Sequence, residues 1–322
     1  MFDIDVYRPD EVDLDEFAGM QRAAFKDLLQ KMGVDNAFMT AEFYQWKYNG
    51  PFGRAKMSLA KDGGRIIAST VNQALEIQHN ENTYRAWQNG DSAMLPQYRG
   101  KGLYHRCVGK AVASLKENEL IYGFPNENSK RGFSAHVPVN KGVIPLLATP
   151  SIFPLTASGK YIAQVESFAE TSLPPGLGLK RGTAALKKTS EYLAWRYDRH
   201  PVNAYTSFMY QHPTASDQAV VVTRKADIGG KRVLLIMELL GGSIRAMARV
   251  LHFAIRKQRT GVATLMFNNT FGIGEMIRLG FMKVPTPLLP KKQLLFVHGS
   301  SGAATALLDI PWLVQMGDWD GF

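Results

Sequence analysis

The sequence predicts an α/β protein in which mixed, twisted sheets are flanked by helices, with two such domains in tandem. The chain has 322 residues, which suits two domains of ordinary size, and 45% of them are hydrophobic. Strand patterns alternate with helix patterns along both halves, and this order favours a mixed sheet. An aromatic segment also occurs twice, about one domain length apart, which indicates an internal repeat.

The first half is predicted to place an aromatic-faced helix ahead of a strand pair. The helix carries Trp46 and is stopped by Pro51. The strands cover residues 56–61 and 65–75, joined by the turn Asp62-Gly63-Gly64. A strand ending at Leu95, a helix over 102–117 and a strand over 120–124 complete this half.

The second half is predicted to repeat this order. Its aromatic helix carries Trp195 and is stopped by Pro201. The strands then cover 204–210, 219–225, 233–240 and 262–267, with a helix over 243–257 before the last of them. Asparagines follow the last strand of each half, at Asn126 and Asn128 and at Asn268 and Asn269.

These correspondences set the predicted domain ranges. The first domain covers 1–157 and the second, a degenerate copy, covers 184–322. Residues 158–183 form a connector, because they contain Ser158-Gly159 and a run rich in proline and glycine. The alternative is that the two aromatic helices match by accident, since tryptophan at a helix end is common in cores.

The most informative feature is a glycine-spaced basic loop between a strand and a helix. A short apolar run ends at Pro96, and Arg99-Gly100-Lys101-Gly102 follows it. Glycines let a ligand approach the backbone, and the first amide groups of a helix point at one place. Arg99 and Lys101 add positive charge. The loop therefore predicts a pyrophosphate site. The helix after it has one apolar face, formed by Leu103, Cys107, Val108, Ala111 and Leu115.

The spacing of this loop excludes two other phosphate motifs. A Walker loop needs Gly-Lys-Ser/Thr, and a dinucleotide loop needs a third glycine where Arg106 stands. The remaining pattern is Gln/Arg-x-x-Gly-x-Gly/Ala, present here as Gln97-Tyr98-Arg99-Gly100-Lys101-Gly102. It resembles the coenzyme A pyrophosphate loop of the Gcn5-related N-acetyltransferase (GNAT) superfamily. A glycine-rich turn that only caps a helix is the alternative.

The resemblance implies which residues hold an acyl-coenzyme A co-substrate. In the superfamily the strand before the loop splays from its neighbour, and its backbone binds the pantetheine arm. An amide N–H of that strand, here Leu95 or Met94, polarises the thioester. The implied coenzyme contacts are Ser92, Ala93, Met94 and Leu95 for the arm and thioester, and Arg99, Gly100, Lys101, Gly102, Leu103 and Tyr104 for the pyrophosphate. A plain buried strand is the alternative for 93–95.

A second motif follows the next strand, at residues 125–133. The superfamily commonly has an asparagine there, a small residue three later, and a tyrosine seven later that protonates the departing thiolate. Asn126 and Ser129 match, which implies coenzyme contacts. The tyrosine position is Phe133, so either the thiolate leaves unassisted or another group serves. Asn126 and Asn128 could instead cap the helix that follows.

Two residues are candidates for the catalytic base. Asp91 lies at the start of the splayed strand, and a raised carboxylate pKa would suit it to accept a proton. His136 follows the Phe133 segment and could work near neutral pH. The alternatives are that Asp91 is a solvated residue after a turn, that a neutral His105 serves, or that positioning with a water relay is enough.

Composition restricts the class of partner. The formal net charge of +10 implies an acidic partner. Because Lys and Arg are scattered, a phosphate-rich coenzyme with a phosphorylated acceptor explains this charge without nucleic acid. The single cysteine excludes a disulfide framework, and no residues have metal-ligand spacing, so we expect no metal. No signal segment or membrane span is expected, and we expect a cytoplasmic protein.

The sequence therefore predicts an N-acyltransferase that moves an acyl group from acyl-coenzyme A to a primary amine, by direct attack in a ternary complex. The Tyr-Gly-Phe-Pro-Asn-x-x-Ser run resembles bacterial members that acylate nucleotide-linked deoxyamino sugars. The alternatives are transfer to a protein, peptide or small-molecule amine, a tandem protein that takes aminoacyl groups from tRNA, or a non-catalytic acyl-coenzyme A sensor. One coenzyme per chain is expected, because Gly241-Gly242-Ser243 lacks the basic residues of the first loop.

Overall fold

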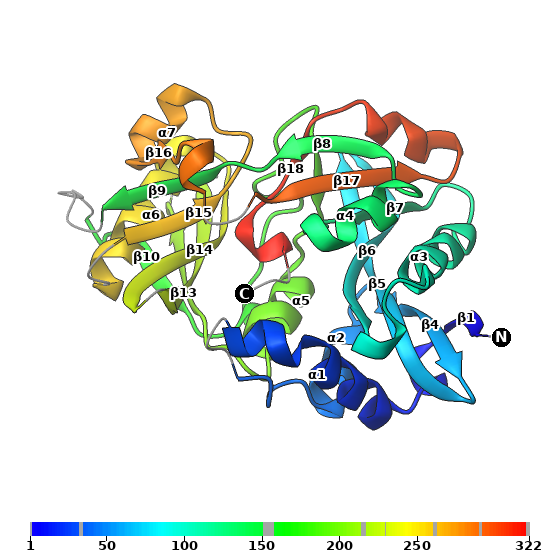
Figure 1. Cartoon of the computed structure of the whole chain (residues 1–322). Helices are drawn as coiled ribbons and strands as arrows, with labels where there is room; N and C mark the ends of the chain where they lie inside the picture. The colour runs from blue at the N-terminus through cyan, green and yellow to red at the C-terminus, as the bar shows by residue number, and fades with distance from the viewer. Residues whose placement is uncertain are drawn as a thin grey trace. The chain divides into compact units, whose positions relative to one another are not determined.

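The computed structural model describes residues 2–31, 35–150, 158–213, 217–228, 230–259, 263–289 and 292–319. They form two compact units. Unit 1 comprises Met1–Ile77, Asn82–Gly142 and Leu294–Ile310, and unit 2 comprises Gln78–Glu81, Val143–Gln293 and Pro311–Phe322. Each unit contains a mixed sheet with helices packed against it, which confirms the predicted fold class (Figure 1).

Unit 1 carries the elements on both sides of the basic loop. Its helices are α1 (Leu14–Lys31), α2 (Ala41–Tyr48), α3 (Leu103–Ala113) and α4 (Glu127–Ser134). Its main strands are β1 (Asp3–Tyr7), β4 (Lys56–Asp62), β5 (Arg65–His79), β6 (Asn82–Met94), β7 (Leu120–Gly123), β8 (Val139–Val143) and β17 (Leu294–Gly299). Strands β2 (Asn49–Gly50) and β3 (Gly53–Arg54) form a small hairpin.

The strands of the unit 1 sheet run in the order β1-β4-β5-β6-β7-β17-β8. Strands β1, β4 and β5 are antiparallel, whereas β6 and β7 are parallel and are connected through α3. The sequence predicted the helix after the loop to run to residue 117, but α3 ends at Ala113. Ser114 ends it early, because its hydroxyl donates back to the carbonyl of Ala111 at 2.7 Å.

The core of unit 1 forms because apolar side chains of α1, α2 and α3 meet those of the sheet. Phe17 and Tyr44 pack edge-to-face at 4.9 Å between ring centroids. From α3, Leu103, Cys107, Val108 and Ala111 are buried, as the predicted apolar face requires. Burial raises the pKa of the Cys107 thiol to about 12, so this thiol is a packing group.

Unit 2 repeats the sheet and its crossover helix. Its helices are α5 (Ser190–Leu193), continued by a π-helical turn η4 (Ala194–Asp198), α6 (Ile244–Gln258) and α7 (Ile273–Leu279). The sheet order is β10-β12-β13-β14-β15-β9-β16. Strands β11 and β18 pair with each other in parallel and are not part of this seven-stranded sheet. The strands are β9 (Leu146–Pro150), β10 (Ile162–Val165), β11 (Ala184–Leu186), β12 (Thr206–Gln211), β13 (Gln218–Ile228), β14 (Lys231–Gly241), β15 (Ala263–Phe267), β16 (Met282–Lys283) and β18 (Trp312–Leu313).

The two sheets exchange strands along the sequence. Strand β17 comes late in the chain but pairs with β7 in unit 1, with Phe296 opposite Gly123. Strand β9 comes from the first half but pairs with β15 in unit 2, with Leu146 opposite Phe267. Residues 294–310 therefore belong to unit 1 although they fall in the predicted range 184–322, and residues 143–150 belong to unit 2 although they fall in 1–157.

Two further features bear on function. No helix in the described parts of the chain is long and apolar enough to cross a membrane. The same residues contain no group of three or more His, Cys, Asp or Glu side chains arranged to hold a metal ion.

Candidate active site

The parallel strands β6 and β7 separate before β6 ends. Their pairing runs from Ala86 with Leu120 to Asn89 with Gly123, where β7 stops. Strand β6 continues to Met94 and leads to the basic loop. Its last five residues therefore have no β7 partner on that side, and the backbone edge of 90–94 that β7 leaves unpaired is called the slot below. The resemblance predicted such a splayed strand at this position.

Asp91 marks the point of separation. Its backbone is left-handed, with φ of 45°, a conformation that Asp tolerates better than most residues. Its carbonyl accepts hydrogen bonds from the Gln21 amide at 3.0 Å and the Ser69 hydroxyl at 2.9 Å. Its carboxylate accepts from Lys47 Nζ at 2.9 Å and from the Tyr48 hydroxyl at 2.8 Å. Hydrogen bonds to both its carbonyl and its carboxylate thus stabilise the irregular backbone at Asp91.

The direction of the backbone amides after Asp91 follows from the pairing with β5. The N–H of Leu95 donates to the Ile67 carbonyl at 3.0 Å and is therefore not aimed at the slot. Successive amides of a strand point to opposite sides. The N–H of Met94 accordingly points away from β5, toward the slot. Of the two amide donors that the resemblance offered, Met94 has the suitable direction.

The basic loop presents its backbone to solvent. After a short turn, η2 (Pro96–Tyr98), the glycines adopt left-handed conformations, with φ of 79° at Gly100 and 69° at Gly102. Gly102 is the N-cap of α3, so the helix begins at Leu103 with Tyr104 in its first turn. Arg99 and Lys101 are exposed beside it. First-turn amides have no carbonyl acceptor inside a helix and can bind an anion.

The motif after β7 forms the first turn of α4. Asn126 is the N-cap, and its side-chain oxygen accepts from the N–H groups of Asn128 and Ser129, both at 3.0 Å. The Ser129 hydroxyl in turn accepts from the Asn126 N–H at 3.1 Å. Capping is therefore a role of Asn126 rather than Asn128. Phe133, at the tyrosine position of the superfamily, is buried against Phe296 with ring centroids 6.4 Å apart.

His136 lies where α4 meets α3. Its ring contacts that of His105 with centroids 4.3 Å apart and the ring planes tilted by 39°, and a side chain at Gly109 would collide with it. Burial lowers the pKa of His136, and the neighbouring His105 lowers it further. The ring is therefore neutral near pH 7. This position makes His136 part of the contact between the two helices.

Unit 2 contains the same strand separation. Strands β14 and β15 pair in parallel from Val233 with Ala263 to Ile236 with Met266, and β14 then continues to Gly241. Glu238 lies two residues beyond the last parallel pair, beside a shift of register against β13. The Tyr197 hydroxyl donates to Glu238 at 2.6 Å.

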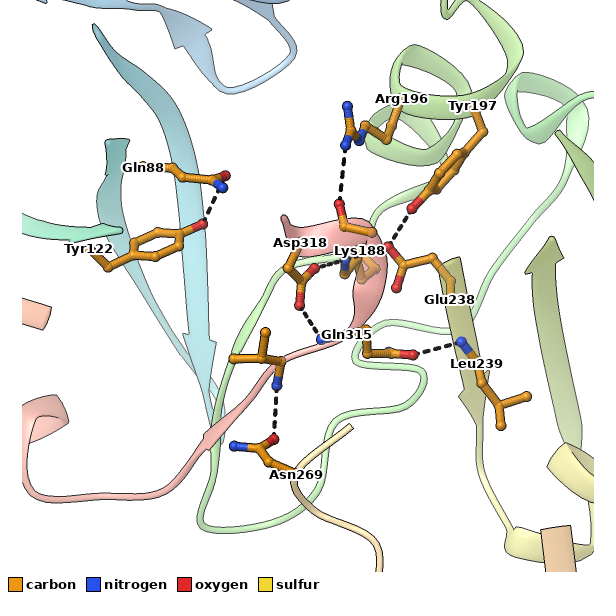
Figure 2. A network of polar contacts seen from close by, with 12 residues as sticks. Gln88, Tyr122, Lys188, Arg196, Tyr197, Glu238, Leu239, Asn269, Gln315 and Asp318 are labelled. Atoms are coloured by element: carbon orange, nitrogen blue, oxygen red, sulfur yellow. Dashed lines mark hydrogen bonds and ion pairs between the residues drawn. The ribbon is translucent and has the colours of Figure 1, made fainter. Parts of the chain in front are cut away.

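The corresponding slot of unit 2 is filled by the chain itself. Gln315 forms an isolated antiparallel bridge with Asn268, just past the end of β15. Its side-chain oxygen accepts the N–H of Leu239 on the separated part of β14 at 2.7 Å (Figure 2). Gln315 thus contacts both strands where they have parted. A side-chain amide here uses a backbone donor that a ligand would need.

Buried charges hold the segment 315–318 in place. Lys188 binds Glu238 at 2.6 Å and also Asp318, and the three side chains are 5%, 0% and 5% exposed (Figure 2). Burial lowers the pKa of Lys188, but Asp318 and Glu238 outweigh this and raise it, so the amine stays charged. Gly317 passes so close to Tyr197 and Glu238 that any side chain there would collide.

Sequence reasoning missed the residues that hold Asp91 and the residue that fills the slot of unit 2. Gln21 and Ser69 are far from Asp91 in sequence and belong to no motif, whereas Lys47 lies in the repeated aromatic segment but 44 residues before Asp91. Tyr48 and Tyr197 had a signal, because each lies in the repeated aromatic segment, two residues after its tryptophan. Gln315 had none.

Comparison with known proteins gives the class of fold. No family model and no curated protein matches the sequence. A conserved protein of unknown function from Enterococcus faecalis V583, described as a probable N-acyltransferase, matches with a TM-score of 0.64 and 10% identity, over 93% of this chain and 72% of that one. A GCN5-related N-acetyltransferase from Anabaena variabilis matches with a TM-score of 0.61 and 7% identity, over 94% and 73%.

A third solved structure is the N-myristoyltransferase of Saccharomyces cerevisiae with bound myristoyl-coenzyme A. It matches with a TM-score of 0.56 and 9% identity, over 91% of this chain and 80% of that chain. The chain therefore has the fold of GCN5-related N-acetyltransferases. In this chain the fold is duplicated, with the open slot of the basic loop in unit 1 and the filled slot in unit 2.

Proposed function

We propose that this chain is an N-acyltransferase that moves an acyl group from acyl-coenzyme A to a primary amine. The observation that carries the proposal is the slot beside residues 90–94, which ends at a glycine loop and a helix N-terminus. An extended thioester arm suits a strand edge with unpaired amides, and a pyrophosphate suits the exposed loop. The two features are adjacent and in the order that one coenzyme molecule requires.

The residues of unit 1 have distinct parts in this reaction. Gly100 and Gly102 leave room for the pyrophosphate, Arg99 and Lys101 neutralise it, and the amides of Leu103 and Tyr104 bind it. Ser92, Ala93 and Met94 line the arm, with the Met94 N–H polarising the thioester carbonyl. A donor aimed at the developing oxyanion stabilises the transition state, because negative charge grows there as the amine attacks. Leu95 anchors the strand to β5.

We further propose that Asp91 acts by position rather than as a base. Both of its carboxylate oxygens accept hydrogen bonds, and the Lys47 ammonium beside it is 7% exposed. Accepting a proton from the substrate would neutralise the carboxylate that pairs with this buried ammonium, which is unfavourable. His136 is the other candidate base. If Asp91→Asn and His136→Ala both keep full turnover across pH, attack relies on positioning and water.

One coenzyme per chain is part of the proposal. Unit 1 has the charged loop, whereas in unit 2 the loop Gly241-Gly242-Ser243 has no basic residue and Gln315 fills the slot. Titration calorimetry with acetyl-coenzyme A tests this, and we expect one site per chain. Two equal sites would contradict it.

For the acceptor we propose the amino group of a nucleotide-linked deoxyamino sugar. The support is the net charge of +10, which suits a doubly anionic acceptor as well as the coenzyme, and the resemblance of the motif around Asn126. Release of free thiol from acetyl-coenzyme A, measured against nucleotide-linked amino sugars, free amino sugars and peptides, tests the choice. Tight coenzyme binding without turnover on any amine would favour a sensor.

A further inference from the structure

Helix α6 of unit 2 has a basic outer face. Its sequence contains Arg245, Arg249, Arg256 and Lys257 but no Asp or Glu. The three arginines recur at spacings of four and seven residues, which places them on one side of the helix. Arg245 and Arg256 are exposed. Basic residues that look scattered along the sequence are therefore gathered on this face.

Helix α7 and the segment after it expose aliphatic side chains. Ile273 and Ile277 lie one turn apart on α7 and are 74% and 71% exposed. Met282, on the edge strand β16, is 67% exposed, and Leu288, at the end of the short turn η5 (Thr286–Leu288), is 70% exposed. Large apolar side chains left in water within one short stretch of chain mark an interaction surface.

The two features lie on the same side of the unit 2 sheet. Both helices pack into the apolar core over strands β12–β15, α6 through Val250 and Leu251 and α7 through Met276 and Leu279. His252 Nε2 on α6 lies 3.1 Å from the Leu279 carbonyl oxygen of α7. Because the inner faces of both helices are turned to the same sheet, their outer faces are directed to solvent on the same side (Figure 1).

The charge beside the exposed aliphatic side chains is also positive. Arg278 on α7 and Lys283 on β16 are exposed. Glu275 is the acidic residue of α7, and Lys180 pairs with it at 3.5 Å. At the start of α6, Asp217 accepts a hydrogen bond from the Ser243 hydroxyl at 2.8 Å. The surface therefore combines exposed aliphatic groups with an excess of basic ones.

We propose that the outer surface of α6, α7 and β16 binds an anionic lipid bilayer. The arginines of α6 attract the negatively charged headgroups, and Ile273, Ile277 and Met282 insert at the boundary between headgroups and acyl chains. Binding of this kind holds a protein on the membrane surface and needs no helix that spans it. The proposal concerns unit 2 alone and does not depend on acyl transfer.

Two other occupants fit this surface less well. Nucleic acid would use the arginines, but its bases stack on aromatic rings, whereas the exposed apolar side chains here are Ile, Met and Leu. A second copy in a two-fold dimer would bring the same surface onto itself, and the basic face of α6 would then meet its own copy. An anionic bilayer complements both the charge and the aliphatic groups.

The test is sedimentation of the purified protein with lipid vesicles. We expect binding to vesicles of equimolar phosphatidylcholine and phosphatidylglycerol, and much weaker binding to phosphatidylcholine alone. Arg245→Gln with Arg256→Gln should lower the partition coefficient about 25-fold, because each basic residue near an anionic surface contributes roughly fivefold. Ile273→Gln with Ile277→Gln should lower it by about tenfold or more, since the inserted apolar area is lost.

Control variants in unit 1 match these changes. Lys26→Gln with Lys110→Gln removes the same charge from exposed positions of α1 and α3. Leu28→Gln removes an aliphatic side chain that is 48% exposed on α1. Both controls should bind vesicles as the wild type does. If a double variant lowers the melting temperature, the single variants Arg245→Gln and Ile273→Gln replace it, each with a loss of about fivefold.

The outcomes decide between the occupants. The inference is wrong if the wild type does not bind the anionic vesicles, or if the controls lose as much binding as the α6 and α7 variants. It is also wrong if only the arginine variant matters and single-stranded RNA binds equally well, because the partner is then a polyanion. A dimer in gel filtration that Ile273→Gln with Ile277→Gln dissociates would assign the surface to a second copy. Coenzyme binding in unit 1 is unaffected by any of these results.

Discussion

Asp91 in unit 1 and Glu238 in unit 2 occupy the same place in their strands, each two residues beyond the last parallel pair. Each accepts a hydrogen bond from a tyrosine, Tyr48 at 2.8 Å and Tyr197 at 2.6 Å. The two tyrosines hold equivalent positions in the repeated aromatic segment. The duplication therefore preserves a tyrosine and a carboxylate at the point where the strands part, although only unit 1 keeps a basic loop.

The ion pair of Asp91 gives a prediction about stability. Asp91→Ala removes the carboxylate that pairs with the buried Lys47 ammonium, and we expect a loss of about 3 kcal/mol in the free energy of unfolding. Urea denaturation measures it. Asp10 is a matched control in the same unit, because its pair with Arg54 is more than half exposed. Asp10→Ala should cost under about 1 kcal/mol. Equal losses would show that burial of the Asp91 pair is not decisive.

The loop glycines give a prediction about binding. Gly100→Ala and Gly102→Ala force a side chain into left-handed backbone at φ of 79° and 69°, which costs about 1–2 kcal/mol each. The loop would relax and its amides would turn from the phosphates, so we expect acetyl-coenzyme A affinity to fall roughly tenfold in calorimetry. Gly64→Ala carries the same strain, at φ of 84° in the turn before β5, and should leave affinity unchanged.

Gln315 allows a test of the filled slot in unit 2. Gln315→Ala removes the acceptor of the buried Leu239 N–H, and an unsatisfied buried donor costs about 1–3 kcal/mol. Thermal unfolding should show the loss. Gln164→Ala, at an exposed position of β10, is the control and should be neutral. An unchanged melting temperature for Gln315→Ala would mean that the side chain does not hold the two strands.

Histidines give a prediction about pH. Burial lowers the pKa of His136, His252 and His298, so each favours its neutral form in the folded chain. Above the ordinary value near 6.5 this stabilisation is fully present, and it is lost as pH falls through the lowered values. The urea concentration at the midpoint of unfolding should therefore decrease as the pH is lowered below about 6.5. His136→Asn should make that drop smaller, and an identical pH profile would assign the effect to other groups.

What the sequence could predict depended on how local the signal was. The loop, α3 and the strands beside them rest on short patterns of glycine, charge and apolar spacing, and the structure has them within a few residues. The ion pair of Asp91 could not be predicted, because Lys47 precedes it by 44 residues and is brought near by the fold. The slot-filling role of Gln315 was hidden for the same reason, since its partner Leu239 lies on β14 and its partner Asn268 lies just past the end of β15.

The strand exchange was missed for a different reason. No strand was predicted over 294–299, and the residues of β17 do not indicate that β7 is its partner. The choice between neighbouring sheets depends on which edge is open, and a periodic pattern does not carry that information.

The same exchange has a consequence for how the protein is made. Unit 1 lacks β17 until residue 299 has left the ribosome, so β7 waits with an unpaired edge while more than half of the chain is still being synthesised. Unit 1 therefore cannot complete its sheet before most of the second half of the chain has been synthesised. A truncated gene product that ends before β17 would carry that bare edge permanently, and aggregation rather than a working fragment is its expected fate.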